Sequence, residues 1–213
     1  MGGTVVIKWG GGLITHKDKL CTVNQGVIES LAEVCKNSNK NLVIVHGAGS
    51  FGHMKAKKYR LADGRIEGIE QDEAVQDVRN DMLELNQIVV TALQAKGLDV
   101  KSFPPHKWAK GTGPNFSGNL PIHDGVTVVY GDVVDDYVKD FGILSGDDLM
   151  LRYATELSGV ERAIFAIGEV DGILRVPPSK AGPDDLIEVW NPEMEFEGEH
   201  ACLLYTSPSP RDS

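Results

Sequence analysis

Short runs of apolar residues alternate along this chain with segments whose apolar residues recur every three or four positions. The runs predict strands at Thr4–Lys8, Leu42–Val45, Val100–Phe103, Val126–Tyr130 and Ala163–Ile167. The periodic segments predict helices that begin after Asn24, near Asp72 and after Ser145. Because strands alternate with helices, we expect an α/β fold built on an open, mainly parallel sheet.

The longest predicted helix runs from about Asp72 to Lys96 and stops at Gly97. Its apolar seam consists of Val75, Val78, Met82, Leu85, Val89 and Ala92. A seam of this kind packs on the sheet or on the same helix of a second subunit, and both interpretations are open. The segment 132–142, DVVDDYVKDFG, is polar and is expected to connect the preceding strand with the last helix.

Glycine-rich turns follow the predicted strands. Gly10–Gly12 follows the first strand, and the stretch Val43–His53, VIVHGAGSFGH, leads the second strand into a glycine turn and then a helix-competent segment. Glycine lets backbone N–H groups approach a phosphate, and the following helix adds its positive end. The alternative is that such turns are only tight connections. Two of them at the carboxyl edge of one parallel sheet favour an anion site.

Charged residues beside these turns are candidates for chemistry. Lys8 closes the first strand and Lys17 follows the turn, so both can neutralise phosphates held there. His53 lies where a helix begins, next to the densest basic cluster of the chain, which favours an anionic substrate. That cluster consists of Lys55, Lys57, Lys58 and Arg60. The alternative for all these lysines is a solvated surface.

Two aspartates fall in the first turn of the last predicted helix, after Ser145, which can cap it. Asp147 and Asp148 either complement the helix dipole or order the lysines or a magnesium ion at the sheet edge. Both interpretations are open. The sequence lacks the P-loop pattern, in which GxxxxGK precedes Ser or Thr, so P-loop nucleotide hydrolysis is not indicated.

Composition narrows the class of protein. The 213 residues are enough for one domain, and 31 acidic against 21 basic residues give a net charge of -10, which argues against a general nucleic-acid binder. Three scattered cysteines, Cys21, Cys35 and Cys202, suit neither a disulfide framework nor a zinc site and favour the reducing cytosol. No apolar run is long enough to span a bilayer, and no signal-peptide pattern opens the chain.

Five motifs together resemble one family. They are KWGGGLITHK, VHGAGSFGH, VVYGDVV, ILSGDD and VDGIL, and their order and spacing over about residues 4–201 resemble the amino-acid-kinase family, in particular its isopentenyl phosphate kinase branch. The GSFGH ending is the specific part. The resemblance implies a three-layer α/β/α sandwich with one domain over residues 1–201. It also implies phosphorylation of isopentenyl phosphate to isopentenyl diphosphate, with ATP and Mg²⁺ as cofactors, in a cytoplasmic homodimer.

The resemblance assigns roles to residues at matched positions. Lys8 and the backbone of Gly10, Gly11 and Gly12 would hold the ATP phosphates, and Lys17 would stabilise the transferring phosphoryl group. Asp147 would orient the two lysines. The remaining residues of the implied ATP-binding set are Gly49 and Asp171.

On the acceptor side, the resemblance implies that His53 hydrogen-bonds the acceptor phosphate. The backbone of Ala48, Gly49 and Gly146 would complete the cradle, and no side chain is implied as a metal ligand. An acceptor that is already a phosphate needs its charge held against a second anion rather than a strong base. A histidine near a helix start, with a lysine on either side, suits that task.

The chain departs from the family pattern at several places. Ala48 replaces the middle glycine of the second turn, so a positive φ there predicts strain. Tyr130 stands where histidine is common, and Gly168-Glu169 stand where Thr-Asp is typical. The distal Gly-Gly-Met-Lys segment of the family is not found, so we expect this chain to bind ATP poorly and to have little or no activity, whereas a full-length version would be active. Residues 202–213, CLLYTSPSPRDS, resemble a translated sequencing adapter and are expected to be a non-native tail.

Two other functions are compatible with these motifs. A kinase of another small phosphate or phosphonate, similar to fosfomycin kinase, shares the GSFGH histidine. A catalytically silent protein of the same fold would use the site only to bind a ligand, and the long helical seam to join subunits.

Overall fold

The structure is a computed structural model that describes residues 3–168, 170, 172–176 and 178–189. Five parallel strands form its central sheet in the order β3-β4-β2-β1-β7. Their bounds are β1 Thr4–Trp9, β2 Asn41–His46, β3 Val100–Ser102, β4 Val126–Tyr130 and β7 Val160–Ala166. Each strand predicted from the apolar runs is therefore present, and its ends lie within a few residues of the expected ones.

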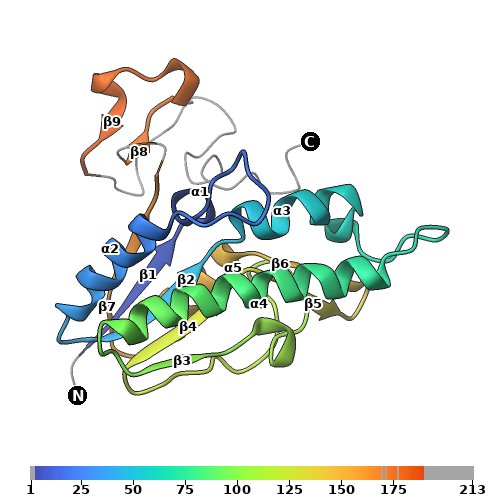
Figure 1. Cartoon of the computed structure of the whole chain (residues 1–213), viewed down its shortest axis with the longest axis horizontal. Helices are drawn as coiled ribbons and strands as arrows, with labels where there is room; N and C mark the ends of the chain where they lie inside the picture. Colours follow the sequence, from blue (N-terminus) through green and yellow to red (C-terminus); the bar gives the residue numbers. More distant parts are fainter. Residues whose placement is uncertain (1–2, 169, 171, 177, 190–213) are drawn as a thin grey trace.

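Helices cover both faces of the sheet (Figure 1). Their bounds are α1 Gly11–Ile14, α2 Gln25–Lys36, α3 Gly49–Lys58, α4 Asp72–Ala95 and α5 Gly146–Glu156. Side chains of α2, α3 and α4 share one apolar cluster with the sheet, whereas α5 packs into a second cluster on the opposite face. The α/β/α sandwich with a mainly parallel sheet is thus confirmed.

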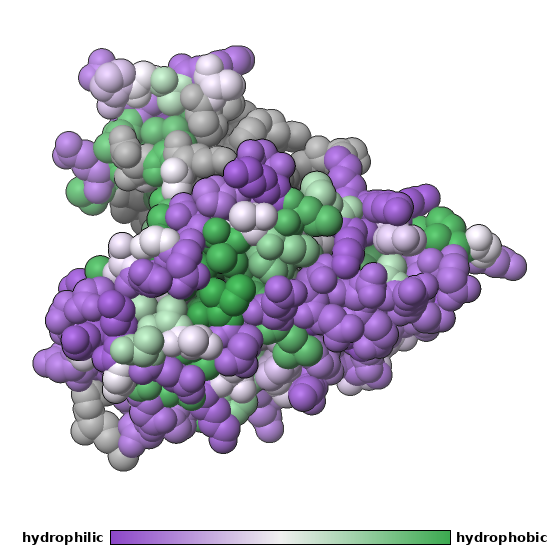
Figure 2. Space-filling model, in the orientation of Figure 1, coloured by the Kyte–Doolittle hydropathy of each residue, from purple (hydrophilic) through white to green (hydrophobic). Residues whose placement is uncertain are grey.

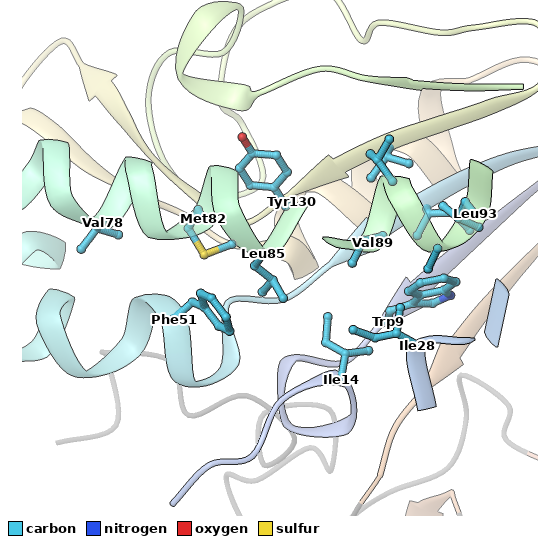
Figure 3. Packing of buried hydrophobic residues seen from close by; sticks show 14 of the residues in the cluster. Trp9, Ile14, Ile28, Phe51, Val78, Met82, Leu85, Val89, Leu93 and Tyr130 are labelled. Carbon is cyan, nitrogen blue, oxygen red and sulfur yellow. The ribbon is translucent and has the colours of Figure 1, made fainter. Parts of the chain in front are cut away.

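The seam of α4 lies in the core of its own subunit (Figure 3). Leu85 and Val89 are 0% exposed, and Met82 is 1% exposed. They meet Phe51 of α3 and Trp9 of β1 in one cluster. Of the two interpretations of this seam, packing within the subunit is the one that the structure shows.

The segment 132–142 was expected to be a polar connection, and this expectation is wrong. It forms most of an antiparallel hairpin of β5 Asp132–Asp136 and β6 Asp140–Leu144. Val133 and Val134 are buried, and Arg79 of α4 donates to the carbonyl oxygen of Val133 over 2.8 Å. The aspartates at the strand ends make the segment polar on average, so the sequence pattern did not reveal the apolar residues that pack the hairpin against the core.

The helices after the two glycine turns begin inside the turns themselves. Both α1 and α3 start on a glycine, at Gly11 and at Gly49. The other short elements are the 3₁₀ helices η1 Leu61–Asp63, η2 Pro105–Lys107, η3 Pro178–Lys180 and η4 Pro183–Asp185, and the two-stranded sheet of β8 Ile173–Leu174 and β9 Leu186–Ile187. The expected tail at 202–213 lies outside the described residues.

The face that carries α4 is mainly hydrophilic, with a hydrophobic patch near its centre (Figure 2). A groove of about 430 Å³ on the surface lies between α2 and α4, lined by Gln25, Glu29, Gln87, Ile88, Thr91, Ala92, Ala95 and Lys96. None of the helices in the described part of the chain has the length and apolar character needed to cross a bilayer.

Replacing Leu85 by alanine should destabilise the fold strongly, because its side chain is fully buried between α4 and the sheet. We expect urea unfolding to show a loss of about 2–5 kcal/mol in the free energy of unfolding. The matched control is Leu151→Ala on α5, where the leucine is 49% exposed, with an expected loss below about 1 kcal/mol. Equal losses in the two variants would contradict the packing described.

Candidate active site

The carboxyl ends of four neighbouring strands, β7, β1, β2 and β4, are tied together at one edge of the sheet. The N–H of Gly10 donates to the carbonyl oxygen of Ala166 over 2.9 Å, and the N–H of Gly47 donates to that of Trp9 over 3.0 Å. On the other side of β2, the N–H of Gly131 donates to the carbonyl oxygen of His46 over 3.1 Å. The turns that follow β1, β2 and β4 are therefore held side by side.

The two glycine turns are in direct backbone contact. A Cβ atom on Gly11 would lie 2.3 Å from the nitrogen of Gly49, and one on Gly47 would lie 2.7 Å from the nitrogen of Gly11. Any side chain at these positions would force the turns apart, since such distances are far below van der Waals contact. The glycines allow the two helix starts, α1 and α3, to meet at the sheet edge.

The strain expected at Ala48 is absent. Ala48 has φ -76° and ψ -34°, the ordinary right-handed helical region, and the positive φ of the turn, +51°, belongs to Gly49. Alanine at position 48 therefore costs no backbone strain. Gly49 has two reasons to be glycine, because a Cβ there would also lie 2.0 Å from the hydroxyl oxygen of Thr15.

Lys8 and Asp147 lie 139 positions apart in the sequence and are brought together by the fold. The ammonium group of Lys8, at the end of β1, forms an ion pair and hydrogen bond with the carboxylate of Asp147 in the first turn of α5. The Lys8 side chain is 5% exposed and that of Asp147 is 43% exposed. The structure places Asp147 in contact with Lys8, one of the two lysines that it was expected to orient, and this ion pair lies beside the glycine turns.

The N-terminus of α5 is capped by its own residues. Ser145 accepts from the N–H of Asp148 over 3.0 Å, as the sequence predicts. Its hydroxyl also donates to the Asp148 carboxylate over 2.8 Å. Asp148 thus completes the cap, which leaves Asp147 to contact Lys8. A Cβ on Gly146 would lie 3.6 Å from the carbonyl oxygen of His46, so the start of α5 lies against the end of β2.

Lys17 extends over the first glycine turn. A Cβ on Gly12 would lie 2.4 Å from Cε of Lys17, so the lysine side chain passes directly over that glycine. Lys17 is exposed and lies in the loop between α1 and α2. Lys8 and Lys17 therefore approach the turn at Gly10–Gly12 from the sheet side and from the solvent side.

His53 of α3 is held in one tautomer. Its Nδ1 lies 3.0 Å from the carbonyl oxygen of Gly49, and because a carbonyl only accepts, Nδ1 carries the hydrogen of this bond. Burial lowers the pKa of His53, the bond to Gly49 opposes that shift, and the charges of Lys17 and Lys8 lower the pKa further. The imidazole is thus neutral near pH 7, with Nε2 left as its acceptor.

Part of the basic cluster after His53 is engaged in ion pairs with neighbouring carboxylates. Lys55 pairs with Asp81 of α4 at 2.7 Å, and Arg60 pairs with Asp63 at 2.8 Å. Two of the four cations are thus neutralised locally. The Lys55 contact ties α3 to α4 and has a structural role.

Tyr130, which replaces a histidine of the family pattern, is fully buried and stacks on His46 with ring centroids 5.0 Å apart. Burial lowers the pKa of His46 to about 4, so this imidazole is uncharged at neutral pH. Neither ring brings charge to the sheet edge. The two stacked rings lie at the carboxyl ends of β2 and β4, where they pack against each other.

Two residues in the site were missed by the sequence analysis, and one predicted residue cannot be placed. Thr15 and Ser50 are buried between the glycine turns, and no spacing rule marks them. Asp171 lies outside the described residues. Within the described ranges, no group of three or more histidine, cysteine or acidic side chains is arranged to hold a metal ion.

The arrangement suits a pair of phosphate groups. Helices begin at Gly11 and Gly49, and the first N–H groups of a helix, which lack partners within it, suit an oxyanion. Lys8 and Lys17 supply positive charge, while His53 supplies a neutral imidazole. No activated nucleophile is needed for transfer between two phosphates, only alignment and neutralisation of charge.

Comparison with known proteins agrees with this chemistry. A profile of the amino acid kinase family matches residues 3–191. The isopentenyl phosphate kinase of Methanothermobacter thermautotrophicus is 32% identical, over 87% of this chain and 74% of that protein. The isopentenyl phosphate kinase of Methanocaldococcus jannaschii is 28% identical, over 79% of this chain and 70% of that protein.

A solved structure of an isopentenyl phosphate kinase has a TM-score of 0.74 at 32% identity, covering 84% of this chain and 76% of that chain. The fold, the sequence match and the paired glycine turns all lead to one assignment. The chain belongs to the amino acid kinase family, and the relatives it resembles within that family are isopentenyl phosphate kinases.

Proposed function

We propose that this protein transfers the γ-phosphoryl group of ATP to isopentenyl phosphate, giving isopentenyl diphosphate and ADP. The observation that carries the proposal is the placement of His53. Its imidazole lies on α3, the helix that begins at the turn in contact with Gly11, and its Nδ1 is fixed by the carbonyl oxygen of Gly49. The charges of Lys17 and Lys8 lower the pKa of this imidazole. An acceptor held by His53 would therefore lie next to a phosphate chain held by the lysines.

On the nucleotide side, Lys8 and the N–H groups of Gly11 and Gly12 would bind the ATP phosphates. Asp147 would fix the Lys8 ammonium group through their ion pair. Lys17, lying over Gly12, would neutralise charge on the equatorial oxygens of the transferring group. Mg²⁺ bound to ATP would supply further charge neutralisation, and the described residues fit a metal carried by the nucleotide better than one held by a protein cage.

On the acceptor side, the N–H groups of Ala48 and Gly49 and the start of α5 at Gly146 would surround the acceptor phosphate. His53 Nε2 would share one proton with a phosphate oxygen. That shared proton reduces the repulsion between the acceptor and the γ-phosphate without requiring a strong base. The proposed location is the cytosol, consistent with the unpaired thiols of Cys21 and Cys35. The proposed assembly is a homodimer.

The second candidate function is phosphorylation of another small phosphate or phosphonate, which the same histidine would hold. A panel of acceptors, tested with the full-length protein and MgATP, separates the two. We expect turnover of isopentenyl phosphate to exceed that of fosfomycin and of short alkyl phosphates by at least about tenfold. Turnover of a phosphonate with none of isopentenyl phosphate would refute the first proposal. Ligand binding without any turnover would favour a silent member of the fold.

Replacing Lys17 by alanine should lower kcat by roughly a hundredfold, because it removes a charge that acts on the transferring group. The matched control is Lys57→Ala, which removes another exposed lysine, from the outer part of α3. Its kcat should stay within about twofold of the wild type. Both variants should unfold at the wild-type temperature. If the two variants have the same kcat, Lys17 does not have the proposed role.

Acceptor binding should take up a proton. Above pH about 7 a phosphate monoester is mainly a dianion, and His53, whose pKa is lowered, is neutral. The complex holds one proton between them, so acceptor affinity falls as pH rises, by at most about tenfold per pH unit. Calorimetry at pH 8 in buffers of different ionisation enthalpy should report up to about one proton per acceptor bound.

The control for proton uptake is His53→Gln, whose amide donates a hydrogen bond without changing protonation. This variant should bind the acceptor more weakly and with a heat that does not depend on the buffer. A wild-type binding heat independent of the buffer would exclude the shared proton.

A further inference from the structure

Helix α3 lacks a cap from its own sequence. Its N-cap residue is Ala48, which has no side-chain acceptor, although the first N–H groups of any helix lack partners within the helix. The missing acceptor comes from Thr15, 35 positions away, whose hydroxyl accepts from the N–H of Ser50 over 3.0 Å. This is the bond that an N-cap serine or threonine would ordinarily make. The start of the acceptor-side helix is therefore completed by the nucleotide-side segment.

The same hydroxyl also makes a bond in the opposite direction. Thr15 donates to the carbonyl oxygen of Gly11 over 2.7 Å, and its side chain is buried, with the residue 3% exposed. One hydroxyl can donate once and still accept, so both bonds form together. Thr15 thus joins the first glycine turn to the second at the place where the two turns touch.

Ser50 of α3 is also hydrogen-bonded to the loop that carries Lys17. The Ser50 hydroxyl accepts from the N–H of Thr22 at 3.3 Å and donates to its carbonyl oxygen at 3.4 Å. The carbonyl oxygen of Ser50 accepts from the N–H of Cys21 at 3.3 Å. Lys17 therefore lies in a short loop whose first end is fixed by Thr15 and whose second end is fixed by Ser50.

The backbone of this loop needs such anchoring. Cys21 has a φ of +46°, a conformation that is unfavourable for a residue other than glycine unless its surroundings hold it. Two further backbone hydrogen bonds close the loop base, from the N–H of His16 to Thr22 and from that of Asn24 to Ile14. The exposed side chain of Lys17 thus stands on a strained but well-anchored loop.

We propose that Thr15 is a positioning residue for phosphoryl transfer, which fixes Lys17 and the acceptor turn relative to each other. The proposal rests on the proposed function of the site. Thr15 is buried beneath the turns and would touch neither substrate; it acts through Ser50 and Gly11. Without its hydroxyl, the first end of the Lys17 loop would lose its bond to α3 and only the anchor at Ser50 would remain, so the in-line alignment would be less well fixed.

The test compares Thr15→Val, which keeps the shape but removes both hydrogen bonds, with Thr15→Ser, which keeps the hydroxyl. We expect Thr15→Val to lower kcat by about tenfold or more while the KM for ATP changes by less than about threefold. Thr15→Ser should recover most of kcat. The matched control is Thr155→Val on α5. Thr155, like Thr15, donates over 2.7 Å to the carbonyl oxygen four residues earlier, but it belongs to neither of the two glycine turns.

Hydrogen exchange gives a second measurement that does not depend on turnover. In Thr15→Val, amides in residues 16–24 and 47–55 should exchange faster than in the wild type, whereas Thr155→Val should leave both segments unchanged. Ser50→Ala keeps the Thr15 bonds and should loosen residues 16–24 alone. This variant also tests the linkage if Thr15→Val fails to fold.

Each outcome decides the proposal. Unchanged exchange in both segments, or a folded Thr15→Val protein with wild-type kcat, would overturn it. A Thr15→Ser variant as slow as Thr15→Val would show that packing, not the hydroxyl, matters. If the wild type phosphorylates no acceptor, the proposed function fails, and the exchange comparison alone then supports or refutes the coupling of the two segments.

Discussion

The backbone contact between Gly11 and the turn at Gly47–Gly49 is the constraint on which the rest of the site depends. Two helix starts, each suited to an anion, lie closer than any side chain would allow. Transfer between two phosphates requires this proximity, but it also brings like charges together. The site therefore needs positive charge at the same edge of the sheet. Lys8 supplies it, because it lies near the carboxyl end of β1, which reaches that edge.

Charge at this edge is local in a chain whose overall charge is negative. The net charge of -10 gives no general attraction for a phosphate, so the attraction comes from Lys8, Lys17 and oriented N–H groups. Lys8 is nearly buried, and its ammonium group is paired with the carboxylate of Asp147. By contrast, Lys55 of the neighbouring basic cluster is neutralised by Asp81 and serves the packing of α3 on α4. Position relative to the sheet edge, not the density of lysines, separates the two groups.

The sequence predicted the parts of the structure that local patterns determine. Strands buried in a parallel sheet are continuous apolar runs, and the seam of α4 has a regular period, so both could be identified.

The hairpin at 132–144 was missed because aspartates interrupt its apolar residues, which pack beneath Arg79 of α4. Strain was expected at Ala48 because alanine stands there in place of the glycine of the family pattern. The positive φ of this turn belongs instead to Gly49. The site residues Lys8 and Asp147 followed from matched motifs, whereas the bonds of Thr15 and Ser50 depend on a contact across 35 positions that no local rule contains.

The two helices that bear acceptor-side and lysine-orienting groups differ in how their first turns are completed. Helix α5 is capped by Ser145, its own N-cap, so the position of Asp147 depends on local sequence. Helix α3 has Ala48 at the same position and borrows its acceptor from Thr15. Local capping makes α5 independent, whereas the borrowed cap makes α3 and the N-terminal segment one unit. That segment carries Lys8, Gly11 and Lys17. The hydrogen bond from the N–H of Ser50 to Thr15 therefore joins the groups that would bind the nucleotide to those that would bind the acceptor. A serine at position 48 would not replace this bond, because residue 48 has helical φ and ψ, whereas Ser145 has the extended backbone from which an N-cap side chain reaches the first turn.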